Sequence, residues 1–573
     1  MNEKITGSEI LLRALVDQGV DEIFGYPGGT IMPVYDSLYD YKDKIKHYLA
    51  RHEQGAIHAA EGYARVSGKT GVVFATSGPG AMNLLTGLND ALIDSTPIVA
   101  VTGQVATPFL GKDAFQESDV VSATLPVTKW TIQVRHADDI AKVVSKAFYI
   151  ANSGRPGPVV IDLTKDAQTE QAEYKCVPCN FIRSYDPDPL IPQTTIEKAA
   201  ELLNNAKRPL ILSGHGVTIA KAESELKEIA EKADIPVGFT MLGLSAMPTD
   251  HRLNMGMLGM HGNIGPNINT NKADVILAIG MRFDDRVTGN VAKYAPNATI
   301  IHIDIDSSEF DKTVKSHLHI HASAKRALDQ LLPHIKNNTH QEWVDSFRPH
   351  AEVEENRVKA RQLKASMYDG KMLMGGVVNK VSKAFGDDAI LVTDVGQNQM
   401  FAVRYFRFKS PRSLVSSGGL GTMGFGLPAS IGAKISCPDR NVVLFVGDGG
   451  LQMTIEELGM VMEYNVGVKI VLLNNNFLGN VRQWQHLFFK GRFSATPMLN
   501  PDFVALAGAY GIKGEDVAHI DTLDAAISRM VSHDGPYLLN VNIEETDMVF
   551  PMTPGGMAVD EIMLDETEFY KPE

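Results

Sequence analysis

The segment between residues 441 and 475 constrains the fold of this chain more than any other, because it reads as a strand, a helix and a second strand. Two short apolar runs, Asn441–Gly447 (NVVLFVG) and Val468–Leu473 (VKIVLL), are typical of buried strands. Thr454 with Glu457 three residues on forms a capping box, which predicts a helix over about Ile455–Tyr464. A right-handed crossover would make the strands parallel and bring their carboxyl ends to one edge, where open α/β sheets bind ligands.

Polar side chains follow both predicted strands at that edge. Asp448 stands in the triplet Gly447-Asp448-Gly449, and Asn475 follows the second strand. One charged and one neutral oxygen ligand suit magnesium, which keeps positions free for phosphate oxygens. Gly449 and Gly450 let backbone amides approach a diphosphate. We therefore predict a magnesium-diphosphate site; the alternative interpretation is a pair of ordinary turns after two strands.

Strands alternate with helices three times along the chain. The other predicted strands are Glu22–Gly25, Val72–Ala75, Ile98–Thr102, Leu210–Ser213, Val275–Gly280, Ile300–Asp304 and Ile390–Asp394. A proline-rich linker from Pro178 to Pro192 and a charged stretch over Lys336–Lys364, expected to be a solvated helix or second linker, separate the thirds. We expect an α/β protein with three doubly wound parallel-sheet domains, over residues 1–180, 190–340 and 365–573.

The composition limits the partners and the compartment. The 573 residues are 44% hydrophobic and 21% charged, which is ordinary for a globular protein with several cores. A net charge of −14 offers no basic face to nucleic acid or to an anionic membrane. The N-terminal segment predicts an amphipathic helix rather than a signal peptide, and no apolar run approaches the roughly 20 residues of a membrane span. We expect a cytoplasmic protein that binds neither nucleic acid nor membrane.

Two short motifs carry little information. Cys176 and Cys179 form a CxxC pair, but no second pair follows, so reduced thiols are favoured over a zinc or redox site. Gly419, Gly421 and Gly424 satisfy GxGxxG, but the preceding SLVSS is a poor strand. We interpret the glycine segment as a cofactor turn rather than a dinucleotide site.

Segments along the whole chain carry a resemblance to a known family. They are FGYPGG (24–29), RHEQ (51–54), TSGPGAMN (76–83), DAFQE (113–117), SGRPGPV (153–159), MLGMHG (257–262), RFDDRVTG (282–289), GGLGTMGFGLPA (418–429) and RQWQ (482–485). With them the chain resembles the catalytic large subunit of the acetohydroxyacid synthases, also called acetolactate synthases, of the biosynthetic FAD-containing type. RFDDRVTG and Trp484 distinguish this family from other thiamin diphosphate enzymes, which share the glycine-rich loops.

The resemblance implies thiamin diphosphate and Mg2+ as cofactors. Glu53 would activate the aminopyrimidine ring of thiamin diphosphate across a dimer interface, so a monomer would be inactive. The plainer interpretation of Glu53 is a carboxylate at the start of a helix, where the dipole favours negative charge. Phe477 would join Asp448 and Asn475 at the metal. The other matching thiamin positions are Thr76, Pro79, Asn83, Val395, Gly396, Gln397, Gly421, Met423, Gly447, Gly449, Gly450 and Gly479.

The resemblance also implies FAD in the middle third, in a largely structural role. An arginine can neutralise a dinucleotide phosphate, and an acidic residue after a strand can hold a ribose hydroxyl. The plainer interpretation of the RFDD segment is a solvated turn. The residues that match flavin-contacting positions are Arg155, Gly214, Gly216, Thr240, Leu242, His261, Gly280, Arg282, Asp284, Arg286, Asp304 and Ile305.

The implied activity joins two 2-oxo acids. Pyruvate would be decarboxylated, and its remaining two-carbon unit joined to pyruvate, giving 2-acetolactate, or to 2-oxobutyrate, giving 2-aceto-2-hydroxybutyrate. This is the first common step of valine, leucine and isoleucine biosynthesis. Trp484 would pack the extra methyl group of 2-oxobutyrate, and Arg282 would pair with the acceptor carboxylate. The implied catalytic set is Glu53, Gln116, Lys165, Arg282 and Trp484, in a homodimer or dimer of dimers served by a separate small regulatory subunit.

Three positions depart from the family pattern. Asn480 stands where methionine is common, Asn398 replaces a frequent histidine, and Ser323 replaces an acidic residue near the flavin. They bear on acceptor preference and cofactor affinity.

Two other functions compete with this one. A pyruvate oxidase would share the cofactors, but RFDDRVTG and Trp484 speak against it. The other alternative is a cofactor-binding protein without activity. The presence of Glu53 together with the predicted metal ligands argues against it.

Overall fold

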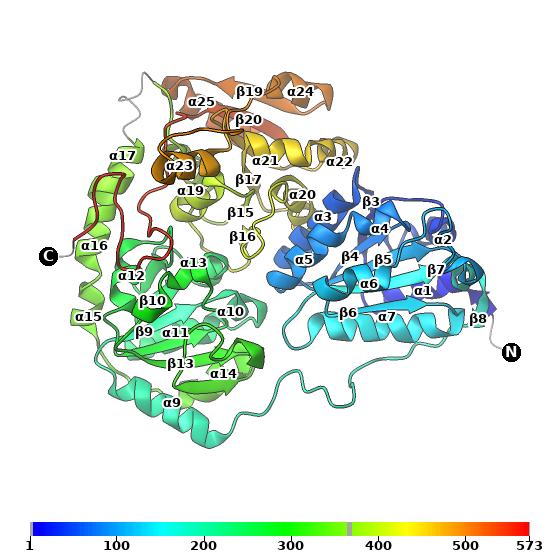
Figure 1. Cartoon of the computed structure of the whole chain (residues 1–573), viewed down its shortest axis with the longest axis horizontal. Helices are drawn as coiled ribbons and strands as arrows, with labels where there is room; N and C mark the ends of the chain where they lie inside the picture. The colour runs from blue at the N-terminus through cyan, green and yellow to red at the C-terminus, as the bar shows by residue number, and fades with distance from the viewer. Residues whose placement is uncertain (1–3, 364–369, 572–573) are drawn as a thin grey trace.

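The structure, a computed structural model, describes residues 4–363 and 370–571. Three six-stranded sheets follow one another along the chain, in the N-terminal, central and C-terminal parts of Figure 1. Within each of the three sheets, neighbouring strands pair in parallel. The predicted α/β fold with three parallel sheets is therefore confirmed. The predicted boundary at residue 365 and the two chain ends lie outside the described residues.

The N-terminal sheet has the order β3-β2-β4-β5-β7-β6. Its strands are β2 (Glu22–Gly25), β3 (Lys46–Leu49), β4 (Gly71–Ala75), β5 (Ile98–Gln104), β6 (Trp130–Val134) and β7 (Val159–Thr164). Its helices are α1 (Gly7–Asp17), α2 (Met32–Leu38), α3 (Glu53–Ser67), α4 (Pro79–Met82), α5 (Leu85–Ile93), α6 (Val120–Thr124), α7 (Ala137–Asn152) and α8 (Lys165–Thr169). A separate antiparallel pair joins β1 (Lys4–Thr6) to β8 (Gln171–Glu173).

The central sheet has the order β11-β10-β9-β12-β13-β14. Its strands are β9 (Pro209–Ser213), β10 (Val237–Phe239), β11 (Asn254–Met257), β12 (Val275–Ile279), β13 (Thr299–Asp304) and β14 (Leu318–His321). Its helices are α9 (Gln193–Asn205), α10 (His215–Ile219), α11 (Glu223–Ala233), α12 (Ile264–Thr270), α13 (Asp285–Thr288) and α14 (Ala324–Leu331). The proline-rich segment before α9 has no helix or strand and runs along the bottom of Figure 1, as predicted for a linker.

The C-terminal sheet has the order β16-β15-β17-β18-β20-β19. Its strands are β15 (Ile390–Thr393), β16 (Leu414–Val415), β17 (Val442–Gly447), β18 (Lys469–Asn474), β19 (Lys513–Val517) and β20 (Tyr537–Asn542). Its helices are α18 (Met374–Phe385), α19 (Gln397–Tyr405), α20 (Gly426–Ser436), α21 (Asp448–Met453), α22 (Leu458–Tyr464), α23 (Gly479–Phe488), α24 (Phe503–Ala509) and α25 (Ile520–Ser532). The C-terminal tail returns to the central domain, where Ile562 and Leu564 pack on α12.

The order of the strands decides where each sheet can bind a ligand. Numbered within each sheet, the N-terminal and C-terminal sheets both run 2-1-3-4-6-5, whereas the central sheet runs 3-2-1-4-5-6, the order of dinucleotide-binding folds. The order reverses between β2 and β4, between β15 and β17, and between β9 and β12. Ligands of open α/β sheets bind beyond the carboxyl ends of the strands at such points.

The predicted strands are confirmed with ends within about two residues, whereas three other predictions hold in part and need correction. The N-terminal helix begins only at Gly7, after strand β1. The charged stretch contains three helical segments, α15 (Gln341–Asp345), α16 (Arg348–Val353) and α17 (Ala360–Leu363), with a π-helical stretch, Glu354–Lys359, between the last two. It is only partly solvated, because Trp343 and Phe347 are buried in the central core.

The predicted capping box is the third error. Instead of one helix over Ile455–Tyr464, a 3-10 turn at Ile455–Glu457 precedes α22. The Thr454 hydroxyl donates to the Gly424 carbonyl at 2.7 Å, and the Glu457 carboxylate accepts from backbone N–H groups of the N-terminal domain. Contacts with distant parts of the chain have replaced the local pairing.

The N-terminal and C-terminal domains share one hydrophobic core. Helix α3 lies against α20 so closely that a Cβ atom on Gly62 would collide with the Ala429 carbonyl, and one on Gly432 with the Ala59 carbonyl. Buried residues of both domains meet around this contact, among them Phe24, Ile57, Phe425 and Leu444. The two domains are thereby fixed relative to each other.

Within residues 4–363 and 370–571, no helix is both long and apolar enough to cross a membrane. All three cysteines are free thiols.

Candidate active site

The tips of β17 and β18 carry the two predicted metal ligands. The strands are parallel and in register, with Gly447 opposite Leu473. Asp448 comes directly after β17 and Asn475 directly after β18, so both lie at the same edge of the sheet, where they are 1% and 3% exposed. Asn475 Oδ1 accepts a hydrogen bond from the Phe477 backbone N–H at 3.2 Å, which draws the predicted third ligand into the same turn.

A residue that the sequence did not reveal organises this edge. Asn500 donates from Nδ2 to Asp448 Oδ2 at 2.7 Å and to the side-chain oxygens of Asn474 and Asn476, both at 3.1 Å. It comes from the loop before α24, far from both strands in sequence, and no local pattern points to it. Burial raises the pKa of Asp448, while the bond from Asn500 opposes that rise.

These oxygens fit a hard divalent cation. One carboxylate and one amide oxygen stand at adjacent strand ends, and such oxygen donors are the kind that magnesium prefers. The described residues hold no cluster of three or more histidine, cysteine, aspartate or glutamate side chains that could bind a metal. A site with one charged ligand leaves room for phosphate oxygens.

Tight packing explains several predicted cofactor glycines. A Cβ atom on Gly450 would collide with Asp394 Oδ1, and one on Gly479 with Gln397 Oε1. Gly396, with φ of 128°, turns the chain from β15 into α19, whose first residue is Gln397. Gln397 is held by hydrogen bonds to the Gln483 side chain and the Asp547 carbonyl at 3.1 and 3.0 Å.

Carboxylates that sequence reasoning missed hold the turn that contains Gly421 and Met423. Asp394 accepts from the backbone of Gly426 at 2.9 Å and Gly424 at 3.1 Å, and Asp94 of the N-terminal domain accepts from Gly418 and Gly419, both at 2.8 Å. Asp94 is itself paired with buried Arg65 at 3.1 Å. The turn is therefore fixed between two domains, beside Gly449, whose Cβ would lie 3.6 Å from Met423 Cε.

Glu53 lies with its predicted companions at the edge of the N-terminal sheet. It is the first residue of α3 and is 8% exposed. Asn83 donates from Nδ2 to Glu53 Oε2 at 2.9 Å. A Cβ on Gly80, in the α4 turn that starts at Pro79, would lie 3.0 Å from Glu53 Oε1 and 2.8 Å from the Thr76 side chain. The structure therefore brings Glu53, Thr76, Pro79 and Asn83 together.

Gln116 borders this group, whereas no contact joins Lys165 to it among the described residues. Gln116 has a positive φ of 60° and packs against the turn at Gly78. Lys165 follows β7 as the first residue of α8 and is exposed. Neither lines the large cavity described next.

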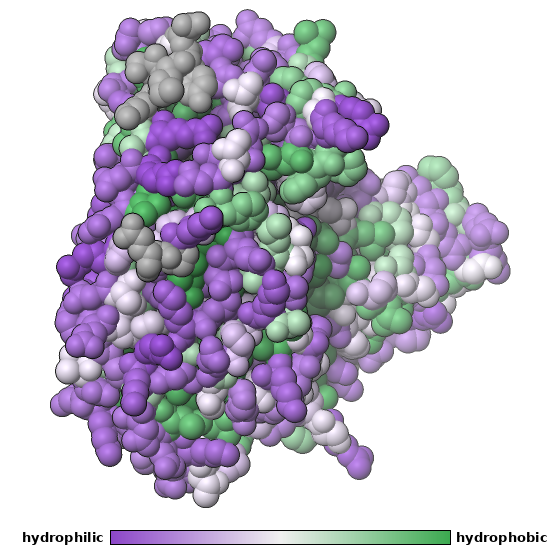
Figure 2. Space-filling model, turned by 60° about the vertical axis from the view of Figure 1, so that its left-hand side comes forward, coloured by the Kyte–Doolittle hydropathy of each residue, from purple (hydrophilic) through white to green (hydrophobic). Residues whose placement is uncertain are grey.

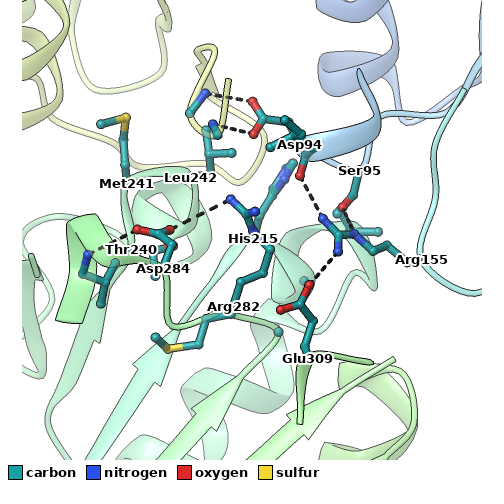
Figure 3. A pocket seen from close by; sticks show the side chains of 18 of the residues that line it. Asp94, Ser95, Arg155, His215, Thr240, Met241, Leu242, Arg282, Asp284 and Glu309 are labelled. Atoms are coloured by element: carbon teal, nitrogen blue, oxygen red, sulfur yellow. Dashed lines mark hydrogen bonds and ion pairs between the residues drawn. The ribbon is translucent and has the colours of Figure 1, made fainter. Parts of the chain in front are cut away.

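A cavity of about 850 Å3 lies where the three domains meet (Figure 3). This volume is in the range of roughly 300–1,000 Å3 that is common for cofactor sites. It opens at the carboxyl ends of β9 and β12, where the central sheet reverses its order. The predicted residues that line it are Arg155, Gly216, Thr240, Leu242, His261, Gly280, Arg282, Asp284, Arg286, Asp304, Ile305, Val395, Gly421 and Trp484. Of the predicted flavin set, Gly214 is the one that does not line it.

Arginines and acids from different domains meet in the cavity. Arg155 donates to Ser95 Oγ at 2.9 Å and to Glu309 Oε1 of the central domain at 3.0 Å, as Figure 3 shows. Arg282 and Asp284 face each other at 3.9 Å. Burial raises the pKa of Asp304 to about 7.

The cavity fits a dinucleotide. Its three arginines can neutralise phosphates, and Asp304 stands at the carboxyl end of β13, where a ribose-binding acid can stand. Burial, aided by the nearby charges of Arg404 and Arg286, lowers the pKa of His261 to about 3, so the ring is neutral. Its Nε2 is buried without a hydrogen-bond partner among the described residues, which leaves it available to a ligand. Gly216 packs on Gly280 so closely that a Cβ on either would meet the other's backbone.

The three unusual residues each have a definite place. Asn480 and Trp484 line the cavity one turn apart on α23, and Asn480 Oδ1 is buried without a partner among the described residues. Ser323 caps α14, and its hydroxyl and backbone N–H bond to Asp188, so an acidic group still lies at this wall. Asn398 donates to the Val395 carbonyl at 3.2 Å.

Known proteins resemble this chain in all three domains. Residues 5–123, 196–331 and 394–541 match the N-terminal TPP binding domain, the central domain and the C-terminal TPP binding domain of thiamine pyrophosphate enzymes. The acetolactate synthase isozyme 3 large subunit of Escherichia coli is 42% identical over 99% of this chain and 100% of its own length. The acetolactate synthase large subunit of Lactococcus lactis is 43% identical over 98% of this chain and 97% of its own. The chain therefore belongs to the family of acetolactate synthase large subunits, within the thiamine pyrophosphate enzymes.

Proposed function

We propose that this protein is an acetolactate synthase that decarboxylates pyruvate and joins the remaining two-carbon unit to pyruvate or 2-oxobutyrate. The products would be 2-acetolactate and 2-aceto-2-hydroxybutyrate, which begin branched-chain amino acid synthesis. The observation that carries the proposal is the single cavity that joins the switch point of the central sheet to Val395, Gly421 and Trp484 of the C-terminal domain. Relatives that match nearly the whole chain bear the same name.

In the proposed site Asp448, Asn475 and the backbone of Phe477 would hold Mg2+, and the metal would anchor the diphosphate of the cofactor. Thiamin diphosphate, when bound, supplies the carbon nucleophile and the electron sink that decarboxylation needs. Glu53 would address the pyrimidine ring of the cofactor as a hydrogen-bonding acid or base. Support for this role comes from the burial of Glu53 and from the Asn83 amide, which holds one carboxylate oxygen at 2.9 Å and fixes its direction.

FAD is the proposed occupant of the central part of the cavity. Arg155 and Arg286 would face its phosphates, Asp304 a ribose hydroxyl, and His261 Nε2 a polar group of the flavin. The support is the unpartnered ring nitrogen, the dinucleotide-type strand order and the arginine-rich wall. A group at this place would touch all three domains, which agrees with a structural role.

The acceptor would bind between Arg282 and α23. The Arg282 guanidinium would pair with the carboxylate of the second 2-oxo acid, and Trp484 would pack its alkyl group. Trp484 is 38% exposed and lies 5.9 Å from the Arg286 guanidinium, so one face of the ring is left for the substrate. Asn480, beside it, would make this pocket more polar than methionine would.

A dimer is the proposed working unit. Glu53 and Asp448 lie at the edges of two different sheets, and apolar side chains near both edges are open to solvent. In the N-terminal domain Phe109 and Phe115 are 57% and 88% exposed. In the C-terminal domain Met453 and Leu499 are 56% and 100% exposed. Figure 2 shows apolar side chains in the hollow between the N-terminal lobe and the rest. A separate small subunit and a cytoplasmic location belong to the same proposal, supported by the name "large subunit" of the relatives and by the free cysteines.

Product analysis tests the proposal directly. The purified protein is supplied with thiamin diphosphate, Mg2+, FAD and a mixture of pyruvate and 2-oxobutyrate, and the two acetohydroxy acids are separated and quantified. We expect both products and no oxygen uptake. Oxygen uptake coupled to pyruvate loss would favour an oxidase, and absence of any turnover would favour a binding protein.

A further inference from the structure

Glu457 belongs to the C-terminal domain but forms hydrogen bonds with the backbone of the N-terminal domain. Its carboxylate accepts from the Arg51 N–H at 3.0 Å through Oε1 and 3.1 Å through Oε2, and from the His52 N–H at 3.0 Å. The side chain is fully buried. These two donors belong to the residues directly before Glu53, at the N-terminus of α3.

The same stretch of the C-terminal domain holds this segment in three more ways. Tyr464 accepts from the Leu49 N–H at 2.9 Å, Glu463 pairs with the Arg51 guanidinium at 2.8 Å, and the Gly459 carbonyl accepts from the same guanidinium at 3.3 Å. The residues Leu49–His52 are thus clamped from the turn before α22 and from α22 itself. We call this set of contacts the interdomain clamp.

Glu457 is the part of the clamp that nothing else replaces. The Glu463 pair is partly exposed, with side chains 28% and 39% accessible, so solvent weakens it. Glu457 instead satisfies two backbone donors in a dry interface, where an unpaired donor is costly. Gly55 provides the space, because a Cβ there would collide with Glu457 Oε1. Burial raises the pKa of Glu457 to about 7 despite the hydrogen bonds and the charge of Arg51, which oppose the rise.

We propose that Glu457 is a positioning residue for catalysis: by holding the backbone of Arg51 and His52, it sets the place and direction of the Glu53 carboxylate. The inference rests on the proposed role of Glu53. Glu457 itself acts through the backbone and needs no contact with substrate or cofactor. A displacement of a reacting group by about 1 Å can cost roughly 100-fold in rate, so a small shift of this segment would be visible in turnover.

The test compares Glu457→Gln with Glu456→Gln, a matched change of the neighbouring residue, whose side chain makes no hydrogen bond or ion pair with the described residues. In Glu457→Gln one amide N–H would face backbone donors. Without cofactors, peptides that cover residues 49–55 should then exchange amide hydrogens faster. In the loaded enzyme kcat should fall by roughly 10- to 100-fold, while the KM for pyruvate and the affinity for Mg2+ stay near wild type. Glu456→Gln should change neither exchange nor kcat.

A second variant covers the case in which Glu457→Gln does not fold. Gly55→Ala pushes the carboxylate away with a single methyl group and should give the same pattern. Unchanged exchange in residues 49–55, or faster exchange with wild-type kcat, would overturn the positioning role. A wild-type protein that makes no 2-acetolactate, or an active Glu53→Gln variant, would instead overturn the proposed function, so the two failures are distinguishable.

Discussion

At the scale of single residues, Asp448 is the one carboxylate at the tips of β17 and β18. Asp448→Ala should weaken the binding of Mg2+ and of thiamin diphosphate together, each by at least roughly tenfold, because the metal carries the diphosphate. Calorimetric titration of the protein with each ligand measures this. The exposed Asp439, changed to alanine, is the control. Wild-type affinity for both ligands in Asp448→Ala would refute the assigned metal site.

The buried Asp304 leads to a second prediction at this scale, on how thermal stability depends on pH. Its ordinary pKa is 3.8, and burial raises it to about 7 in the folded protein. As pH rises, the Asp304 carboxyl therefore stays protonated to a higher pH in the folded protein than in the unfolded chain. Its contribution to the stability of the folded state is lost as pH rises from about 4 to 7. Asp304→Asn keeps its uncharged side chain at every pH. Without flavin, its Tm relative to wild type should rise across that interval and level off above it.

The measurement is a series of thermal melts of both proteins at fixed ionic strength. Asp439→Asn, a change at an exposed site, should leave the difference from wild type independent of pH. A constant difference for Asp304→Asn would show that the buried carboxyl does not titrate in this interval.

At the scale of elements, α23 carries the acceptor wall of the cavity. Trp484→Leu removes the flat surface that would pack the additional methyl group of 2-oxobutyrate. One methylene in a pocket is worth about 1–3 kcal/mol, so the ratio of 2-aceto-2-hydroxybutyrate to 2-acetolactate should fall roughly tenfold in competition. Phe488→Leu, one turn further along α23 and outside the cavity, is the matched control. An unchanged ratio in Trp484→Leu would remove Trp484 from acceptor selection.

At the scale of the whole molecule, the proposed dimer combines Glu53 of one chain with Asp448 of the other. Glu53→Gln and Asp448→Ala should each be inactive alone. When the two proteins are mixed and allowed to exchange subunits, half of the dimers are hybrids with one intact site, so activity should return to about a quarter of wild type. Sites formed within a single chain would give no recovery, provided that exchange is confirmed by differently tagged chains.

Much of the candidate site could be predicted from local sequence. The apolar runs that end at Gly447 and Leu473 locate two strand tips, and parallel pairing brings Asp448 and Asn475 to one edge. Family motifs likewise locate Glu53 with Asn83, and eleven of the twelve predicted flavin positions line the cavity. Asn500, Asp394 and Asp94 were not predicted as functional, because each acts on a part of the chain that is distant in sequence.

By itself, then, the sequence determined the strands, their parallel pairing and the chemical types of the site residues, because periodicity and strand ends are local properties. Only the tertiary structure decided that Glu457 bonds to the backbone of Arg51, 406 residues away, instead of forming the predicted capping box. It also decided that Arg155 of the N-terminal domain donates to Glu309 of the central domain. Such contacts depend on how α3 and α20 bring whole domains together, and a buried polar group bonds to whichever partner that packing supplies.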